Sequence, residues 1–194
     1  MNKRELILIG GGGHCVSCID VIEQENIFKI AGIVDLKERI GEKILSYPVV
    51  ATDGDLESLS KSYEFFLITL GQLGSGERRT ALYNILIELK VSIPTIVSPY
   101  AYLSKHATVG KGTILMHQSL VNANAKIGDN CIINTKALVE HDAIIGSHCH
   151  ISTGAVVNGG VTVGENTFYG SGAVSKEGII IPAKSFIKAN SVVK

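Results

Sequence analysis

The sequence lacks an excess of charge of either sign. Its 194 residues include 18 lysines and arginines and 18 aspartates and glutamates, so the formal net charge is zero. Proteins that bind DNA, RNA or anionic membranes usually carry a basic stripe, and no run of basic residues marks one here. We therefore expect neither a nucleic-acid partner nor a membrane partner.

Long apolar runs and a cysteine framework are missing as well. The apolar run Leu6–Ile9 is too short for the core of a signal peptide, and no later stretch approaches 18 apolar residues. Four cysteines in a chain of this length do not suggest a disulfide-bonded scaffold, which fits a reducing compartment. With 45% hydrophobic and 19% charged residues, the chain can bury a core. We expect a globular cytoplasmic protein.

The first half of the chain alternates strand and helix signals. Short apolar segments predict strands, at residues 5–9, 29–35, 65–70 and 95–97. Apolar residues at helical spacing predict two helices, at residues 14–25 and 75–90. A β-α-β order of this kind predicts a small, Rossmann-like parallel α/β domain over residues 1–97.

The second half, residues 98–194, repeats every six residues. One position of the repeat is aliphatic in all but two cases: Leu103, Val109, Leu115, Val121, Ile127, Ile133, Val139, Ile145, Ile151, Val157, Val163, Tyr169, Ser175, Ile181 and Ile187. The position four residues later is small, or β-branched and of modest size, in all cases but Ile179: Ala107, Thr113, Ser119, Ala125, Cys131, Ala137, Ala143, Cys149, Ala155, Val161, Thr167, Ala173, Ile179, Ser185 and Ser191.

A period of six fits neither a single helix nor a flat strand. It predicts an all-β solenoid whose faces take six residues each, with the aliphatic side chain pointing inward and the small residue at a tight turn. Three faces make a coil of 18 residues, so residues 18 apart should stack in columns. Cys131 and Cys149 then stack as small core residues, while Cys15 and Cys18 are expected to pack inside a helix.

Two departures from this pattern point to chemistry. One column reads Ile114, Ile132, His150, Phe168 and Phe186, and packing alone does not predict an imidazole there. The other departure is Glu140-His141-Asp142, in which a carboxylate could fix the tautomer of the imidazole and raise its basicity.

These residues carry a resemblance to a known family. Residues 139–146, VEHDAIIG, followed by residues 150–155, HISTGA, resemble the signature of the PglD/NeuD family of bacterial sugar acetyltransferases. Gly12-Gly13-His14 is similar to the N-terminal signature of the same family, and the likeness covers nearly the whole chain. The resemblance implies that the solenoid is a left-handed parallel β-helix. It also implies a homotrimer that binds acetyl-CoA in grooves between neighbouring subunits.

The resemblance further implies roles for individual residues. His141 matches the general base and Asp142 the carboxylate beside it, which in the family is often Glu. His150 matches a contact to acetyl-CoA near the thioester, and Ser171 and Ala189 match positions along the cofactor. We expect the imidazoles of His141 and His150 to reach one shared groove.

The glycine-rich segment predicts a ligand site in the first domain. Gly10–Gly13 follows a strand and precedes a helix, where backbone N–H groups can bind phosphate, but it does not complete a dinucleotide fingerprint. The resemblance implies that a nucleotide-linked sugar is held there. The residues assigned to it are Gly12, Gly13, His14, Asp35 and Gly71. Leu36 stands where members often carry a second acidic residue, which leaves the nucleotide open.

The predicted reaction is transfer of acetyl from acetyl-CoA to an amino group, the 4-amino group of a UDP-linked deoxysugar. O-acetylation of a sugar such as sialic acid is an alternative, and a sugar-binding scaffold without catalysis is another. Some β-helical carbonic anhydrases hold zinc with three histidines, and His106, His117, His141, His148 and His150 supply candidates. Their spacing does not match that trio, so we expect no metal.

Overall fold

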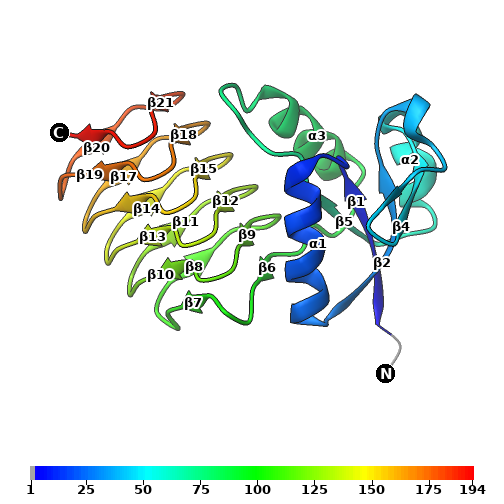
Figure 1. Cartoon of the computed structure of the whole chain (residues 1–194), viewed down its shortest axis with the longest axis horizontal. Coiled ribbons are helices and arrows are strands. Elements are labelled where there is room, and N and C mark those ends of the chain that lie inside the picture. Colours follow the sequence, from blue (N-terminus) through cyan, green and yellow to red (C-terminus); the bar gives the residue numbers. More distant parts are fainter. Residues whose placement is uncertain (1–2) are drawn as a thin grey trace. The chain divides into compact units, whose positions relative to one another are not determined.

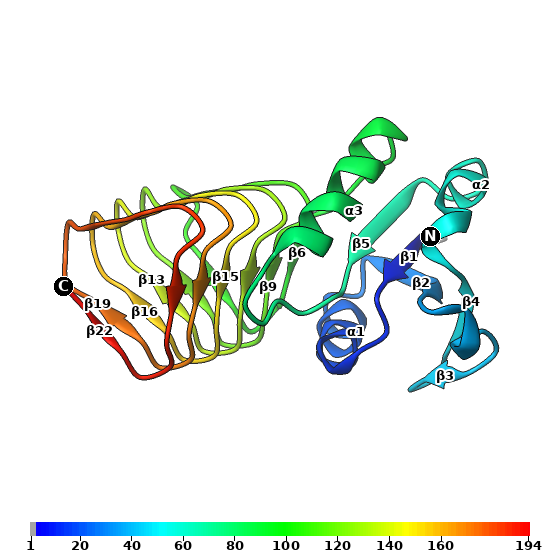
Figure 2. The same cartoon turned by 90° about the horizontal axis from the view of Figure 1, so that it is seen from above.

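The structure, a computed structural model, describes residues 3–194 (Figures 1 and 2). The chain divides into two compact units. The α/β unit contains the residues up to Gly71 together with Ala81–Pro94, and the β-helix unit contains Gln72–Thr80 and Thr95–Lys194.

The α/β unit is built on a five-stranded sheet of order β3-β4-β2-β1-β5, which is parallel except for β3. The strands are β1 (Arg4–Ile9), β2 (Phe28–Val34), β3 (Lys43–Ile44), β4 (Tyr47–Ala51) and β5 (Phe65–Ile68). The helices are α1 (Gly13–Glu25), α2 (Leu56–Ser60) and α3 (Glu77–Glu88), with short 3-10 segments η1 (Lys37–Arg39) and η2 (Asp53–Asp55). Helix α3 begins among residues of the β-helix unit and ends in the α/β unit.

The predicted parallel sheet is confirmed, with two differences. The hairpin of β3 and β4 and the helix α2 were not predicted. The prediction of a final α/β strand at residues 95–97 is wrong, because β6 (Ile96–Val97) pairs with a strand of the β-helix. The apolar run Leu6–Ile9 lies in β1, and all four of its side chains are fully buried.

The β-helix unit consists of two-residue strands that form three parallel sheets, as the repeat predicts (Figure 1). Face 1 contains β7 (Tyr102–Leu103), β10 (Leu120–Val121), β13 (Leu138–Val139), β16 (Val156–Val157), β19 (Val174–Ser175) and β22 (Val192–Val193). Face 2 contains β8 (Thr108–Val109), β11 (Lys126–Ile127), β14 (Ile144–Ile145), β17 (Thr162–Val163) and β20 (Ile180–Ile181). Face 3 contains β6, β9 (Ile114–Leu115), β12 (Ile132–Ile133), β15 (His150–Ile151), β18 (Phe168–Tyr169) and β21 (Phe186–Ile187).

The second residue of each strand points into the solenoid, and successive coils pair in register 18 residues apart. Val121 pairs with Val139, for example, and both are fully buried. The small residues also face inward and complete the core, as Ala125 and Ala155 illustrate. All four cysteines are buried and free, which confirms that they act as packing residues.

The corners of the coil impose their own residue requirements. From Thr113 onward, the residue before each small position adopts a left-handed conformation, as at Asn124 with φ 61° and Asp142 with φ 60°, and Asn, Asp and Gly tolerate it best. At the corner between faces 2 and 3 the coils are too close for side chains, because a Cβ on Gly128 would lie 2.6 Å from the backbone N of Ser147. Gly146 belongs to the same column and faces the backbone of Glu165 at the same distance.

Candidate active site

His141 lies in the corner that connects β13 on face 1 with β14 on face 2, and 63% of its side chain is exposed. Its Nδ1 is 2.8 Å from Oδ2 of Asp142. An ionised carboxylate can only accept a hydrogen bond, so Nδ1 carries the proton and Nε2 presents its lone pair. The corner therefore holds an exposed imidazole in the tautomer that a general base requires.

The charges around His141 favour its protonated form. The hydrogen bond to Asp142 has the largest effect and raises the pKa of His141, and desolvation partly opposes it. The negative charges of Asp142 and Glu140 raise this pKa further. The Asn124 amide and the His141 imidazole in turn lower the pKa of Asp142, which keeps this carboxylate ionised. The result is a more basic nitrogen at the surface of the coil.

The neighbouring coils supply three further residues that the sequence reading missed. One coil before, Asn122 Nδ2 donates to Glu140 Oε2 over 2.7 Å and Asn124 Nδ2 donates to Asp142 Oδ1 over 2.5 Å. One coil after, the Cα of Gly159 faces the imidazole of His141. Each of the three residues is 18 positions from its partner. The expected stacking of residues 18 apart would therefore have identified them.

His150 begins β15 on face 3, where it pairs with Ile132 and Phe168. This confirms the predicted column, but only 5% of the residue is exposed. Its Nδ1 donates to the carbonyl oxygen of Gln72 over 2.8 Å, and its Nε2 accepts from the Asn134 amide over 3.0 Å. Burial lowers the pKa of His150 to about 4, although the Gln72 hydrogen bond acts in the opposite direction. This imidazole is therefore neutral.

Within one chain, His141 and His150 lie on different parts of the coil. The two residues are nine positions apart, which is half a coil, so His141 lies at the corner of faces 1 and 2 whereas His150 lies on face 3. The residues that stack are those a full coil apart.

Ser171 and Ala189 lie at the third corner, between β18 on face 3 and β19 on face 1 and one coil further along. Both residues are exposed, and they stack, because the backbone N of Asn190 donates to the carbonyl of Ser171. The Ser171 hydroxyl is 2.9 Å from the Ser152 hydroxyl on the preceding coil. Face 1 is therefore bordered by the corner of His141 on one side and by the corner of Ser171 and Ala189 on the other.

The glycine loop of the α/β unit connects β1 with α1. Gly12 is the residue before α1, and a Cβ on Gly12 or Gly13 would meet no atom within 4 Å. A Cβ on Gly71 would lie 3.4 Å from Cβ of His14, so these two predicted residues are neighbours. The loop leaves open space beside the N-terminus of a helix, an arrangement that suits phosphate groups.

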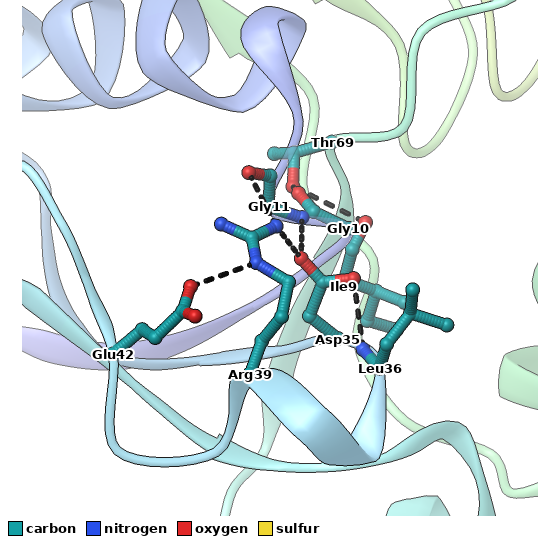
Figure 3. Close-up of polar contacts among 8 residues, drawn as sticks. All are labelled: Ile9, Gly10, Gly11, Asp35, Leu36, Arg39, Glu42 and Thr69. Atoms are coloured by element: carbon teal, nitrogen blue, oxygen red, sulfur yellow. Dashed lines mark hydrogen bonds and ion pairs between the residues drawn. The ribbon is translucent and has the colours of Figure 1, made fainter.

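Asp35 ties this loop to the end of β2, as Figure 3 shows. Its Oδ2 accepts from the backbone N of Gly11 over 3.1 Å and from Nη1 of Arg39, while its Oδ1 accepts from the backbone N of Leu36 over 2.9 Å. Arg39 also donates to the carbonyl of Gly11 and, through Nε, to Glu42. Both carboxylate oxygens of Asp35 thus already have partners within the protein.

No group of three or more His, Cys, Asp or Glu residues that could hold a metal ion occurs within residues 3–194. Over the same part of the chain, no helix has the length and apolar character needed to cross a membrane.

Comparisons with known proteins agree with this architecture. The PglD N-terminal domain family matches residues 5–85, and the bacterial transferase hexapeptide family, a model of six repeats, matches residues 124–159. Comparison with curated proteins gives no match.

Solved structures match over almost the entire chain. The acetyltransferase domain of PglB from Neisseria gonorrhoeae FA1090 is 25% identical with a TM-score of 0.91, covering 99% of this chain and 92% of its own. A mutant of GDP-perosamine N-acetyl transferase from Caulobacter crescentus, in complex with CoA and GDP-perosamine, is 30% identical with a TM-score of 0.90, covering 98% and 88%. PerB from the same organism is 31% identical with a TM-score of 0.89 and covers the same shares.

The α/β unit, the left-handed β-helix and these matches lead to one conclusion: the chain belongs to the PglD/NeuD-type family of bacterial sugar acetyltransferases.

Proposed function

We propose that this acetyltransferase transfers the acetyl group of acetyl-CoA to an amino group of a nucleotide-linked amino sugar, with His141 as the general base. The observation that carries the proposal is the Nδ1 hydrogen bond of His141 to Asp142, which leaves the lone pair of Nε2 at an exposed corner. The similar C. crescentus enzyme was solved with CoA and GDP-perosamine, which supports this class of substrates.

The proposed reaction is a direct transfer. The amine nitrogen of the sugar attacks the thioester carbonyl, the new C–N bond forms and the C–S bond breaks. Nε2 of His141 accepts the proton that the nitrogen loses and then delivers it to the departing CoA sulfur. Asp142 accepts the hydrogen bond from Nδ1–H of His141 throughout the reaction and stabilises the transient imidazolium.

Two features support the homotrimer that the family resemblance implies. The outward residues of face 1 are all apolar: Tyr102, Leu120, Leu138, Val156, Val174 and Val192. A flat apolar face of this kind suits burial against another copy. The two borders of the face also carry different parts of the predicted site, His141 on one and Ser171 with Ala189 on the other.

A cyclic trimer reconciles the separation of His141 and His150 with a common site. In a ring of three, each interface is heterologous, so one border of face 1 meets the opposite border in the next subunit. His141 of one subunit would then act on acetyl-CoA held by Ser171, Ala189 and His150 of its neighbour. Each active site in this arrangement needs two chains.

The sugar nucleotide is assigned to the open glycine loop. Gly12 and Gly13 would donate backbone N–H groups to the diphosphate, while His14 and Gly71 border the same space. Asp35 would act mainly by shaping the loop through Gly11 and Leu36. A UDP-linked 4-amino deoxysugar remains the proposed substrate. A GDP-linked amino sugar is the alternative substrate. We propose a cytoplasmic location for the reaction, because both substrates of the proposed reaction would be available there.

The test is a screen of UDP- and GDP-linked amino sugars with acetyl-CoA, in which released CoA thiol is measured. The His141→Ala variant should lose about 100-fold or more in kcat, because a positioned general base contributes at least that much. Turnover with sialic acid alone would indicate O-acetylation instead. Sugar-nucleotide binding without any turnover would indicate a non-catalytic scaffold, and an unchanged rate of His141→Ala would remove the proposed base.

A further inference from the structure

The coil that precedes His141 carries an asparagine that reaches the catalytic pair. Asn124 Nδ2 is 2.5 Å from Oδ1 of Asp142, and the other oxygen of the same carboxylate is 2.8 Å from Nδ1 of His141. Asn124 is therefore the first member of a hydrogen-bond chain that runs from one coil to the next. Its amide bonds to Asp142, and Asp142 in turn bonds to His141.

The Asp142 carboxylate needs a second hydrogen-bond partner because burial does not fix its orientation. The side chain of Asp142 is 55% exposed, so water competes for both of its oxygens. Without a second contact, the carboxylate can rotate about its own bonds and release the Nδ1–H of His141. The Asn124 amide fixes one oxygen and thereby keeps the other directed at the imidazole.

We propose that Asn124 is a positioning residue for the acetyl transfer: it orients Asp142, which in turn fixes the Nδ1–H tautomer of His141. The inference rests on the proposed function in one respect, namely that His141 is the base. Asp142 and Glu140 are the charged groups that act on the His141 imidazole. Glu140 is held separately, by Asn122 and by the backbone N of His141.

The conformation of Asn124 provides a competing explanation that can be separated. Asn124 has a φ of 61°, and asparagine is favoured in this left-handed region whatever its side chain contacts. Gln118 and Lys136 adopt the same conformation at another corner. Because glycine also accepts this conformation at little cost, Asn124→Gly removes the amide and keeps the backbone. Gln118→Gly makes the same change at that other corner of the chain and is the matched control.

The first measurement is the 15N spectrum of the imidazoles, which reports the tautomer and the pKa of His141 without any substrate. In the wild-type protein the Nδ1 of neutral His141 should be protonated and Nε2 unprotonated. Asn124→Gly should give a mixture of both tautomers and bring the pKa of His141 down toward its ordinary value. Asn124→Asp, which places a second carboxylate beside Asp142, should disturb the tautomer in the same way.

The second measurement is the rate of transfer as a function of pH. Asn124→Gly should lower kcat about 10-fold, while KM for both substrates stays unchanged, because the general base is misaligned and binding is not. The acid limb of kcat/KM should move to lower pH together with the pKa of His141. Gln118→Gly should match the wild-type protein in both measurements.

The outcomes separate this inference from the proposed function. If Asn124→Gly leaves the tautomer and the pKa of His141 as in Gln118→Gly, the positioning role is overturned, whatever the activity of the wild-type protein. If the tautomer changes but no nucleotide-linked sugar is acetylated, the positioning of His141 stands and the proposed function fails. A simple loss of fold is recognised by an altered melting temperature of Asn124→Gly relative to Gln118→Gly. In that case the Asn124→Asp spectrum decides.

Discussion

Gly159 lies against the imidazole of His141, so close that a methyl group on its Cα would stand 2.7 Å from Nε2 and 2.8 Å from Cε1. The two residues are one coil apart, and the backbone N of Gly160 donates to the carbonyl of His141 beside them. The missing side chain at position 159 thus leaves the space in which the proposed base lies.

Alanine at position 159 should displace this imidazole. We expect Gly159→Ala to lower kcat about 100-fold, because a displacement of about 1 Å is enough to misalign a proton transfer. The melting temperature should stay unchanged, since the exposed imidazole can rotate away. Gly54→Ala is the control, because its Cβ would meet Thr52 only at an ordinary 3.6 Å. Unchanged kinetics of Gly159→Ala would contradict this account of the corner.

His150 should make the stability of the protein depend on pH. Its pKa is lowered to about 4 in the folded chain, whereas an unfolded chain binds the proton near pH 6.5. Stability is therefore complete above pH 6.5 and decreases as the pH falls toward 4, by about 3 kcal/mol at most. Urea unfolding of the wild-type protein and of His150→Phe at several pH values measures this difference.

His150→Phe should flatten that pH dependence, because phenylalanine fits the column of Phe168 and Phe186 and does not titrate. The exposed His106→Gln variant should keep the wild-type profile. Equal slopes for the wild-type protein and His150→Phe would show that His150 is not held neutral by burial.

Asp35 should stabilise the glycine loop even without a ligand. Asp35→Asn replaces one of the two acceptor oxygens by an NH2 group, so either the Gly11 and Arg39 donors or the Leu36 N–H lose their acceptor. We therefore expect the free energy of unfolding to fall by about 1–3 kcal/mol. Glu57→Gln, which breaks an exposed pair with Lys61, should change it by less than about 0.5 kcal/mol. Urea denaturation without substrate compares the two. An Asp35→Asn variant as stable as Glu57→Gln would leave direct ligand contact as the remaining role of Asp35.

Face 1 should control self-association. Leu138→Lys puts a charge at the centre of its apolar column, so we expect this variant to elute as a monomer and the wild-type protein to elute as the proposed trimer. Light scattering during gel filtration measures the mass. Lys126→Glu on face 2 changes charge without touching this column and should remain trimeric. A trimeric Leu138→Lys protein would exclude face 1 as the interface.

The β-helix could be predicted from the sequence because the residues that specify each coil are close together in the sequence. Each hexad repeats the same inward aliphatic and small residues, so the period alone indicates the coil. Residues 95–97 were assigned to the wrong unit because a short apolar run is typical of strands in both units. Only the pairing of β6 with β9 decides between the two units. The contact of His150 with the carbonyl of Gln72 spans 78 positions, and no sequence pattern indicates it.

The site was predictable where its residues are adjacent or one coil apart. His141 and Asp142 are neighbours in the sequence, and their hydrogen bond is present. Asn124 and Gly159 were not predicted as site residues, although each lies 18 positions from its partner. Asparagine and glycine are common in turns, so their presence at a corner of the coil does not by itself indicate a contact with the site. His141 and His150 do not stack within one chain, since nine positions carry the chain to another face.

That half-coil separation has a genetic consequence. If each site combines His141 of one subunit with His150 of the next, a ring that mixes His141→Ala and His150→Phe chains contains one interface with both imidazoles intact. Random mixing in equal amounts would restore about a quarter of the wild-type activity, since about three quarters of the rings are mixed and each regains one site in three. Two defective alleles expressed in one cell would therefore complement each other, although neither supports the reaction alone.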